Sequence, residues 1–192
     1  MYKKMREYTH EEFVDIIKKL NEEELLELSA NYGGYPVLFR MALDERINHI
    51  PFIQTGSSII VRNEKNEILL QQRSDNNRWG LPGGCQDLGE NLKNTAIREL
   101  FEETGIKVNI EELILLDTLS GSERKRTYPN GDVVYNNTSL YLVDVDSKKL
   151  TLKIDSESLK LKFFSLTELP DSLHDGDLIE EYQKYLNNKS KN

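Results

Sequence analysis

Residues 84–106 read GCQDLGENLKNTAIRELFEETGI, and this stretch is the most informative part of the chain. It fits the pattern G-x5-E-x7-R-E-U-x-E-E-x-G-U, where U is an apolar residue, at every fixed position. The fixed positions are Gly84, Glu90, Arg98, Glu99, Leu100, Glu102, Glu103, Gly105 and Ile106. So many constrained residue types at fixed spacing are far more specific than an isolated glycine motif.

The spacing within this stretch predicts an amphipathic helix over about residues 91–104. Apolar residues recur at helical spacing, as Ala96, Ile97, Leu100 and Phe101. Gly105 supplies the stop expected just beyond a helix end. Glu99, Glu102 and Glu103 are related as i, i+3 and i+4, so their carboxylates share one face, about 130° from the centre of the apolar stripe. One side of the helix can therefore be buried while the other lines a cleft.

Three carboxylates on one helix face indicate a divalent metal site. Like charges at this spacing repel, and Glu102 and Glu103 fall in the last turn, where the helix dipole disfavours acids. A divalent cation compensates for both effects, because carboxylate oxygens are hard ligands that suit Mg²⁺ or Mn²⁺, which in turn bind phosphate oxygens. The alternative is a solvated acidic helix end, the usual explanation for a run such as Glu22–Glu24 in the same chain.

We expect different placements and contacts for Glu90 and Arg98. Glu90 would fall about 180° from Glu99 if the helix ran that far, so we expect it in the preceding turn, where the chain can fold back. Arg98 lies four residues before Glu102, and this spacing predicts an ion pair.

The pattern resembles the signature box of the Nudix hydrolases, and the preceding WGLPGG of residues 79–84 is also a common lead-in in that family. The resemblance implies an α/β fold, an α/β/α sandwich with a mixed β-sheet. It implies hydrolysis of a diphosphate linkage in a nucleoside diphosphate attached to a further group X, such as a nucleoside triphosphate, ADP-ribose or a nucleotide sugar. The implied cofactor is Mg²⁺, with Mn²⁺ as a substitute, and the implied partner is a small-molecule nucleotide.

The resemblance also implies a metal-ligand set. Glu102, Glu103 and the carbonyl of Gly83 would bind the metal, and Glu99 would be a further ligand or the base that deprotonates water. From the residues alone, the glycine pair after Pro82 predicts a tight bend with exposed carbonyls, for which unusual backbone angles are the simpler explanation.

Other residues would support this set. The resemblance implies that Glu90 and Arg98 orient the catalytic carboxylates. Some members of the family place the base on a later loop, and Asp155 and Glu157 occupy a suitable loop here. The alternative for both acids is plain solvent exposure.

Substrate contacts lie outside the pattern. The run SERKR at residues 122–126 concentrates positive charge in an acidic chain, which suits distal phosphates, although a solvated loop is the alternative. Two tyrosines could stack on a base, although packing is the commoner role of aromatic residues near a hairpin. The candidate substrate-binding residues are Arg73, Arg78, Arg124, Arg126, Tyr128 and Tyr135. ADP-ribose-cleaving members of the family often carry a proline where this chain has Ser122, which weakens an assignment to ADP-ribose.

Composition restricts the partners. The net charge of −8 over 192 residues argues against a general nucleic-acid or anionic-membrane surface, so we expect no stable nucleic-acid complex. The single cysteine, Cys85, excludes an internal disulfide, and we interpret it as a small residue rather than a nucleophile. The first residues lack the apolar core of a signal peptide, and no segment has the length of a membrane span. We therefore expect a cytoplasmic protein.

We expect a helical N-terminal extension over residues 1–50 and a Nudix hydrolase domain over residues 51–192. Packing is the default role of the extension, with a homodimer arm or a substrate-side lid as alternatives. Within the domain, apolar runs predict strands at 52–61, 68–70, 113–119, 133–145, 150–154 and 159–164. Residues 129–132 (PNGD) predict a turn, and residues 177–186 a closing helix.

Two other functions are compatible with parts of this pattern. Isopentenyl diphosphate isomerase resembles Nudix proteins but needs its own cysteine and glutamate placements, which the single Cys85 does not support. A non-catalytic ligand sensor or interaction module could use the N-terminal helices as its partner surface. The intact glutamate set argues against this module, because a pure binder has no obvious need for three clustered carboxylates.

Overall fold

The computed structural model describes residues 15, 19, 51–128 and 133–190, and the structural statements below concern these residues. The helices predicted over residues 1–50 and the turn predicted at residues 129–132 lie outside them. The domain boundary at residue 50 stays a prediction.

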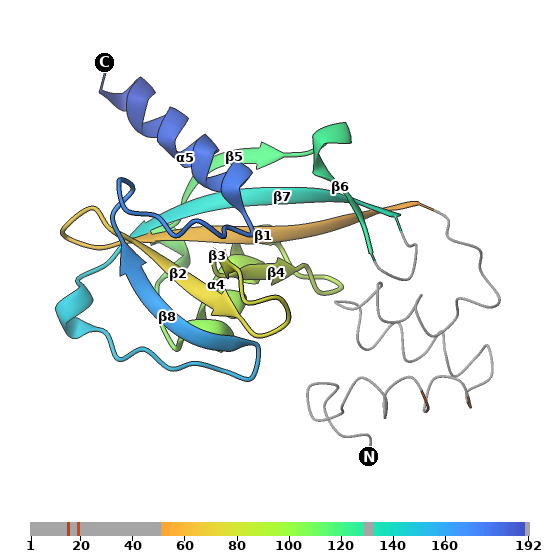
Figure 1. The fold of residues 1–192 in the computed structure, drawn as a ribbon, viewed down its shortest axis with the longest axis horizontal. Helices are drawn as coiled ribbons and strands as arrows, with labels where there is room; N and C mark the ends of the chain where they lie inside the picture. The colour runs from red at the N-terminus through yellow and green to blue at the C-terminus, as the bar shows by residue number, and fades with distance from the viewer. Residues whose placement is uncertain (1–14, 16–18, 20–50, 129–132, 191–192) are drawn as a thin grey trace.

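A mixed β-sheet forms the centre of the molecule (Figure 1), with the strand order β3-β2-β1-β7-β5 and three further strands paired beside this path. The strands are β1 (Phe52–Arg62), β2 (Ile68–Arg73), β3 (Trp79–Gly80), β4 (Gly83–Cys85), β5 (Ile114–Leu119), β6 (Lys125–Thr127), β7 (Val133–Asp144) and β8 (Ser158–Phe164). The two longest, β1 and β7, run parallel from the pair Phe52↔Val134 to the pair Arg62↔Asp144. The remaining strand pairs are antiparallel.

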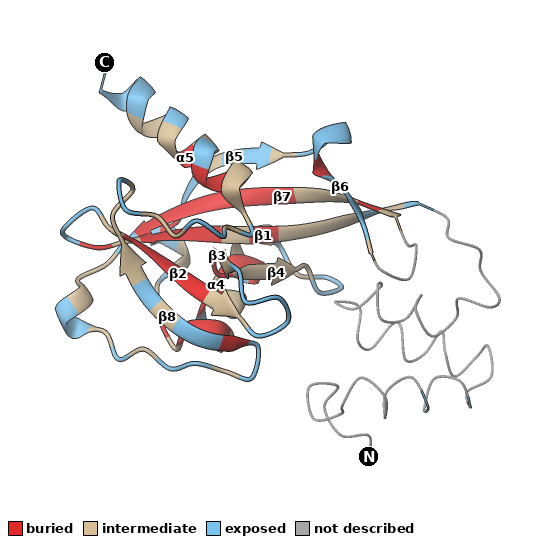
Figure 2. Ribbon diagram, in the orientation of Figure 1, coloured by how far each residue is buried: buried red, intermediate tan, exposed pale blue. Residues whose placement is uncertain are grey.

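Helices α4 (Leu92–Thr104) and α5 (Gly176–Lys189) cover opposite faces of this sheet. Successive side chains of a strand point to opposite faces, so each long strand contributes to two cores. The core under α4 includes Ile59, Val61, Leu100, Tyr141 and Val143. The core under α5 includes Ile60, Leu140, Leu142, Leu178 and Tyr182. Figure 2 shows this burial along the second half of β1 and of β7 and at the beginning of β2. The expected α/β/α sandwich with a mixed sheet is confirmed.

The predicted helix over residues 91–104 is α4. The Asn91 side chain caps its first turn by accepting a hydrogen bond from the Asn94 N–H at 3.0 Å. Gly105 ends the helix in the left-handed conformation, with φ of 74°, and its N–H bonds to the Phe101 carbonyl.

The strand predicted at residues 150–154 is wrong, because residues 150–157 follow an irregular path. Lys153 N–H donates to the Thr104 carbonyl at 2.9 Å, so the end of α4 takes one of its backbone hydrogen bonds. Leu150 and Leu152 pack against the core under α4. The alternating apolar residues that predicted a strand therefore pack against the core under α4 without forming a strand.

The connection expected over residues 120–132 contains more structure than its sequence predicts. A short 3-10 helix, η3 (Ser122–Arg124), leads into β6, which pairs with the beginning of β7.

Gly83 and Gly84 belong to β4, which pairs with β1, so the bend lies one residue earlier than predicted, at Pro82. Gly83 does have an unusual backbone angle, with φ of 155°. A Cβ atom at Gly83 would lie 2.3 Å from the Ser57 carbonyl oxygen, and one at Gly56 would lie 2.3 Å from the Gly84 carbonyl oxygen. The glycines are therefore needed for the close approach of two backbones. Within the described ranges, no helix is both long and apolar enough to cross a bilayer.

Gly56→Ala tests this close approach. We expect the added methyl group to push β1 away from β4 and to lower the free energy of unfolding by about 1–3 kcal/mol, measured by urea denaturation. The matched control is Gly176→Ala, where a Cβ atom meets nothing within 4 Å. Equal stability of the two variants would contradict the packing argument.

Candidate functional site

Arg98, in the middle of α4, lies among four carboxylates, those of Asp87, Glu90, Glu99 and Glu102. Its Nε and Nη2 atoms each donate to one carboxylate oxygen of Glu90 at 3.0 Å. Its Nη1 atom donates to Glu99 at 2.5 Å and to Glu102 at 3.3 Å, so the expected i,i+4 pair is present. Nη2 also donates to the Cys85 carbonyl at 2.8 Å. Burial disfavours the charged guanidinium, but the surrounding carboxylates outweigh it and raise the pKa of Arg98.

Glu90 lies in the turn before α4, as expected. Besides Arg98, it accepts hydrogen bonds from the Thr95 hydroxyl at 2.8 Å and from the Asp87 N–H at 3.2 Å. Burial alone would raise the pKa of Glu90, but these hydrogen bonds bring it below its ordinary value. Glu90 therefore stays ionised at neutral pH and ties the turn to the helix.

Glu103 is buried, with only 4% of its surface exposed. Its Oε2 atom accepts a hydrogen bond from the Gly83 N–H at 2.8 Å. Burial raises the pKa of Glu103 to about 8, against the opposing effect of hydrogen bonds from Gln71 and Gly83. A carboxyl group in this position is costly to ionise unless a cation is near.

The pairing of β4 with β1 does not use the carbonyl of Gly83. Ile59 N–H donates to the Pro82 carbonyl at 2.9 Å. Hydrogen-bonded and non-hydrogen-bonded pairs alternate along an antiparallel ladder, so the next pair, Ser58↔Gly83, is not hydrogen-bonded. Both polar backbone groups of Gly83 therefore face outward, and its N–H is the group that holds Glu103.

Gly84 allows Glu99 to approach the same strand. A Cβ atom at Gly84 would lie 2.6 Å from the carboxylate carbon of Glu99. The side chain of Glu99 is 12% exposed and that of Glu102 is 29% exposed. The three helix glutamates thus line the edge where α4 meets β4, and their exposure increases from Glu103 to Glu102.

These donors fit a divalent cation. The three carboxylates and the carbonyl of Gly83 are hard oxygen donors of the kind that Mg²⁺ and Mn²⁺ prefer. Across the part of the chain that the structure describes, no three acidic, histidine or cysteine side chains are arranged as a finished metal site. Arg98 and the Gly83 N–H bind the glutamates instead. A cation would favour the ionised form of Glu103, which burial disfavours.

Of the two candidate loop acids, Glu157 lies near the cluster. Its negative charge contributes to the raised pKa of Glu103, and its carbonyl accepts a hydrogen bond from Ser74 N–H at 2.8 Å. Asp155 instead accepts a hydrogen bond from the Glu157 N–H at 3.0 Å and so shapes the turn.

The candidate substrate-binding residues fall in different places. Arg124, expected in an open loop, is only 6% exposed. It donates to the Asp177 carboxylate and to the Thr138 hydroxyl, the latter at 3.0 Å, and so joins η3 to the beginning of α5. Arg126 is exposed, 3.7 Å from the same aspartate.

Tyr128 lies near Arg73 and near Cys85, the last residue of β4. Arg73 forms a bidentate ion pair with Asp75, in which its Nε and Nη2 atoms each donate to one carboxylate oxygen at 3.0 Å. Burial raises the pKa of Tyr128, and the charges acting on it include those of Cys85, Arg73 and Arg126.

The remaining two candidates lie elsewhere. Arg78 is exposed and donates to the Leu173 carbonyl. Tyr135 pairs with Ile53 and Lys125 in the sheet and lies on the face that α4 covers.

Sequence reasoning missed the segment just before α5. Trp79 N–H donates to the Ser172 carbonyl at 2.9 Å, and His174 N–H donates back to the Trp79 carbonyl at 2.7 Å. The Asp175 carboxylate accepts a hydrogen bond from Leu81 N–H at 3.1 Å. The adjacent histidine and aspartate were the only sequence signal, and their spacing does not indicate a ligand pair.

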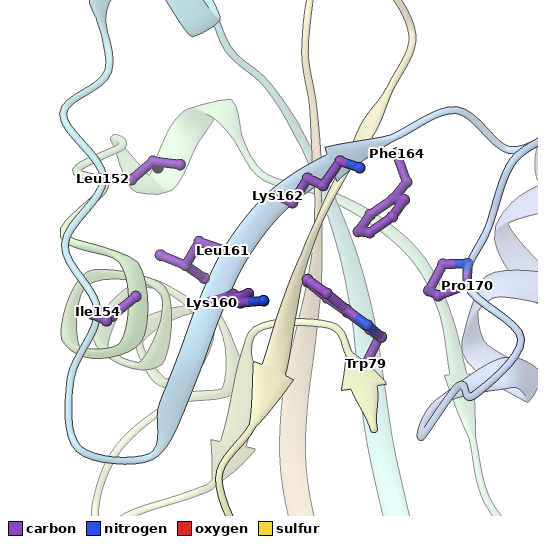
Figure 3. Close-up of a pocket in the computed structure, with 8 residues that line it drawn as sticks. All are labelled: Trp79, Leu152, Ile154, Lys160, Leu161, Lys162, Phe164 and Pro170. Carbon is purple, nitrogen blue, oxygen red and sulfur yellow. The ribbon is translucent and has the colours of Figure 1, made fainter. Parts of the chain in front are cut away.

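A hollow of about 680 Å³ lies beside β8 (Figure 3). Its lining consists of Trp79, Leu152, Ile154, Lys160, Leu161, Lys162, Phe164 and Pro170. Leu152 and Ile154 lie on one side of the strand, and Trp79 and Pro170 on the other (Figure 3). None of the clustered glutamates lines this hollow, so it is separate from the carboxylate site.

Residues 53–184 match the family model described as NUDIX domain. The chain is 31% identical over 126 residues to an ADP-ribose pyrophosphatase of Methanocaldococcus jannaschii, which covers 64% of this chain and 69% of that protein. It is 50% identical over 50 residues to a putative 8-oxo-dGTP diphosphatase of Bacillus subtilis, which covers 26% of this chain and 34% of that protein. The chain thus spans about a third of this second relative.

Solved structures share the fold. A MutT NUDIX hydrolase from Burkholderia pseudomallei superposes with a TM-score of 0.56 at 25% identity, over 69% of this chain and 98% of that one. The NUDIX domain of Shewanella oneidensis NrtR, solved in complex with ADP ribose, superposes with a TM-score of 0.57 at 22% identity. That match covers 87% of this chain and 99% of the NrtR domain, and it concerns the fold alone.

Arg98→Ala should strongly destabilise the protein, because it leaves the largely buried carboxylates of Glu90 and Glu99 without their cation. We expect a loss of about 3 kcal/mol in the free energy of unfolding, measured by chemical denaturation. The control is Arg62→Ala, whose partner Asp144 is 60% exposed, so its loss should be about 1 kcal/mol. Similar losses in both variants would argue against a special role for Arg98.

Cys85 should react slowly with alkylating reagents. Burial, assisted by the negative charge of Glu99, raises the pKa of its thiol to about 11. At pH 8 we expect alkylation by iodoacetamide to be roughly a hundredfold slower than in the urea-unfolded chain, because the thiolate is the reactive form. The folded-state rate should still be rising with pH at pH 10. A plateau near pH 8 would contradict the raised pKa.

Proposed function

The chain belongs to the Nudix family, and on that premise we propose that it is a metal-dependent hydrolase of nucleoside diphosphate-linked compounds. The observation that carries this proposal is the gathering of Glu99 and Glu103 beside β4, where Glu103 binds the Gly83 N–H and Glu99 approaches Gly84. Glu102 is joined to Glu99 through Arg98. Hard oxygen donors of this kind, beside a buried carboxyl group, suit a divalent cation that also binds phosphate.

Each residue of the edge has a proposed part. Glu102, Glu103 and the Gly83 carbonyl would hold Mg²⁺, which when bound neutralises the charge of the diphosphate and helps to activate water. Arg98 and Glu90 orient the helix carboxylates through the hydrogen bonds described above. These two residues act through the glutamates and do not themselves touch the phosphates.

The base that takes the proton from the attacking water would be Glu99 or Glu157. Glu99 is held at 2.5 Å by Arg98, which favours a fixed position beside β4. Glu157 is exposed at the turn before β8, and its charge acts on Glu103 across the site. A base must reach the water directly, so replacing the true base by glutamine should lower kcat more than the other replacement.

The substrate side is proposed around Arg73, Arg126 and Tyr128, because both arginines lie near enough to Tyr128 to affect its pKa. Arg124 has no part in it, because its guanidinium is buried against α5. The related proteins carry names of enzymes acting on 8-oxo-dGTP and on ADP-ribose, and both compounds therefore belong among the substrates to test first.

Glu102→Gln and Glu103→Gln test the proposal. Purified protein with Mg²⁺ would be incubated with nucleoside triphosphates, 8-oxo-dGTP, ADP-ribose, nucleotide sugars, dinucleoside polyphosphates and 5′-triphosphorylated RNA. We expect turnover of at least one class, its loss on chelation, and its fall by at least about 100-fold in either variant, because each removes a charged metal ligand.

The control for this test is Glu111→Gln, which removes one exposed glutamate outside the site and should keep full activity. Binding of a panel member without turnover, equally tight in the wild type and in Glu102→Gln, would favour a ligand sensor. Turnover that survives chelation would exclude metal dependence.

A further inference from the structure

The segment before α5 is hydrogen-bonded to β3, the strand that precedes Gly83 and Gly84. Two backbone hydrogen bonds join Trp79 to Ser172 and His174, at 2.9 and 2.7 Å. Trp79 and Leu173 also form a parallel bridge. The beginning of the last helix is therefore attached to β3, although about 90 residues separate the two in the chain.

Asp175 adds a side-chain contact to this attachment. Its Oδ2 atom accepts a hydrogen bond from Leu81 N–H at 3.1 Å, and Leu81 itself is only 3% exposed. A Cβ atom at Gly80 would lie 2.7 Å from the same oxygen. The absence of a side chain at Gly80 is what allows the carboxylate to reach the backbone.

The side chain of Asp175 does not do what its position predicts. Asp175 is the N-cap residue of α5, where an aspartate normally accepts a hydrogen bond from the first helical turn. Here the carboxylate makes no such bond, and only its backbone carbonyl receives the helix N–H groups, from Leu178 and Ile179 at 3.1 and 3.2 Å. Helix capping therefore does not explain the placement of this carboxylate.

The contact lies two residues before Gly83. Between them stands Pro82, whose ring fixes φ and whose carbonyl is held by Ile59 N–H at 2.9 Å. The path from Leu81 to Gly83 is thus anchored at one end by Asp175 and in the middle by β1. The direction of the Gly83 N–H and carbonyl follows from these two anchors.

We propose that Asp175 is a positioning residue for the metal site. It holds Leu81 so that the Gly83 N–H meets the Glu103 carboxylate and the Gly83 carbonyl stays aimed at the same point. The inference rests on the proposed function for the metal itself, whereas the backbone contacts stand without it.

Three variants test the role. Asp175→Ala removes the acceptor, Asp175→Asn keeps an oxygen that can accept from Leu81, and Gly80→Ala displaces the carboxylate without altering it. The matched control is Asp144→Ala. It removes an aspartate that binds Arg62 at 2.6 Å, at the C-terminal end of β1 and beyond the residues that pair with β4.

Two measurements do not depend on turnover. Hydrogen exchange of the metal-free protein reports on the amides of Leu81, Gly83 and Gly84, and electron paramagnetic resonance reports Mn²⁺ binding without substrate. In Asp175→Ala and Gly80→Ala we expect faster exchange of these amides and about tenfold weaker Mn²⁺ binding, as for the loss of a group that orients a metal ligand. Asp175→Asn and the control should stay within about twofold of the wild type.

Kinetics separate positioning from substrate contact. A positioning role predicts that Asp175→Ala lowers kcat about tenfold at fixed Mg²⁺ with little change in KM. A raised KM with unchanged Mn²⁺ affinity would show that Asp175 touches the substrate and would overturn the inference. If Asp175→Ala does not fold, Gly80→Ala decides by the same measurements.

Mn²⁺ binding distinguishes a failure of the proposed function from a failure of the positioning role of Asp175. Wild-type protein that neither binds Mn²⁺ nor turns over any substrate would refute the proposed function and this inference with it. Wild-type Mn²⁺ binding that Asp175→Ala and Gly80→Ala leave unchanged would refute the positioning role alone.

Discussion

The guanidinium of Arg98 is the interaction on which the acidic helix depends. Glu99 and Glu102 lie near each other on α4, and Glu90 folds back onto the same region from the preceding turn. Without a shared cation, these charges would repel one another and oppose both the turn and the helix. Arg98 binds all three and the Cys85 carbonyl, so the helix, the turn and the end of β4 are joined at one point. The cluster is thereby compatible with a folded protein in the absence of metal.

Glu103 is the exception, because Arg98 does not reach it. Its carboxyl group is buried against β4 and has the Gly83 N–H as its close backbone partner. A protein selected only for stability would place an apolar residue here, since ionising a buried carboxyl group costs free energy. Local rules of this kind are broken most often at functional sites. The raised pKa of Glu103 is therefore consistent with a carboxylate whose negative charge is balanced when a cation binds.

The site joins segments that are distant in the chain. Helix α4 supplies the carboxylates, β4 supplies the backbone groups, and the turn before β8 brings Glu157 near Glu103. The segment before α5 holds the path into β4 through Leu81. The glycines allow the backbones of β1 and β4 to pack closely against each other. A small displacement of one segment is therefore transmitted to the others. Residues that never touch a substrate can therefore influence the geometry of the metal ligands.

The features that depend on local spacing could be predicted from the amino-acid sequence. Periodicity placed α4 and put Glu99, Glu102 and Glu103 on one face, and apolar runs placed most strands, because side-chain direction follows directly from helix and strand geometry. Long-range packing determines that Gly83 and Gly84 form a strand, that residues 150–154 do not, and that Arg124 is buried. It also decided that Asp175 binds Leu81 instead of capping its own helix. These outcomes depend on partners far away in the chain, and a partner of that kind leaves no regular spacing around the residue it contacts.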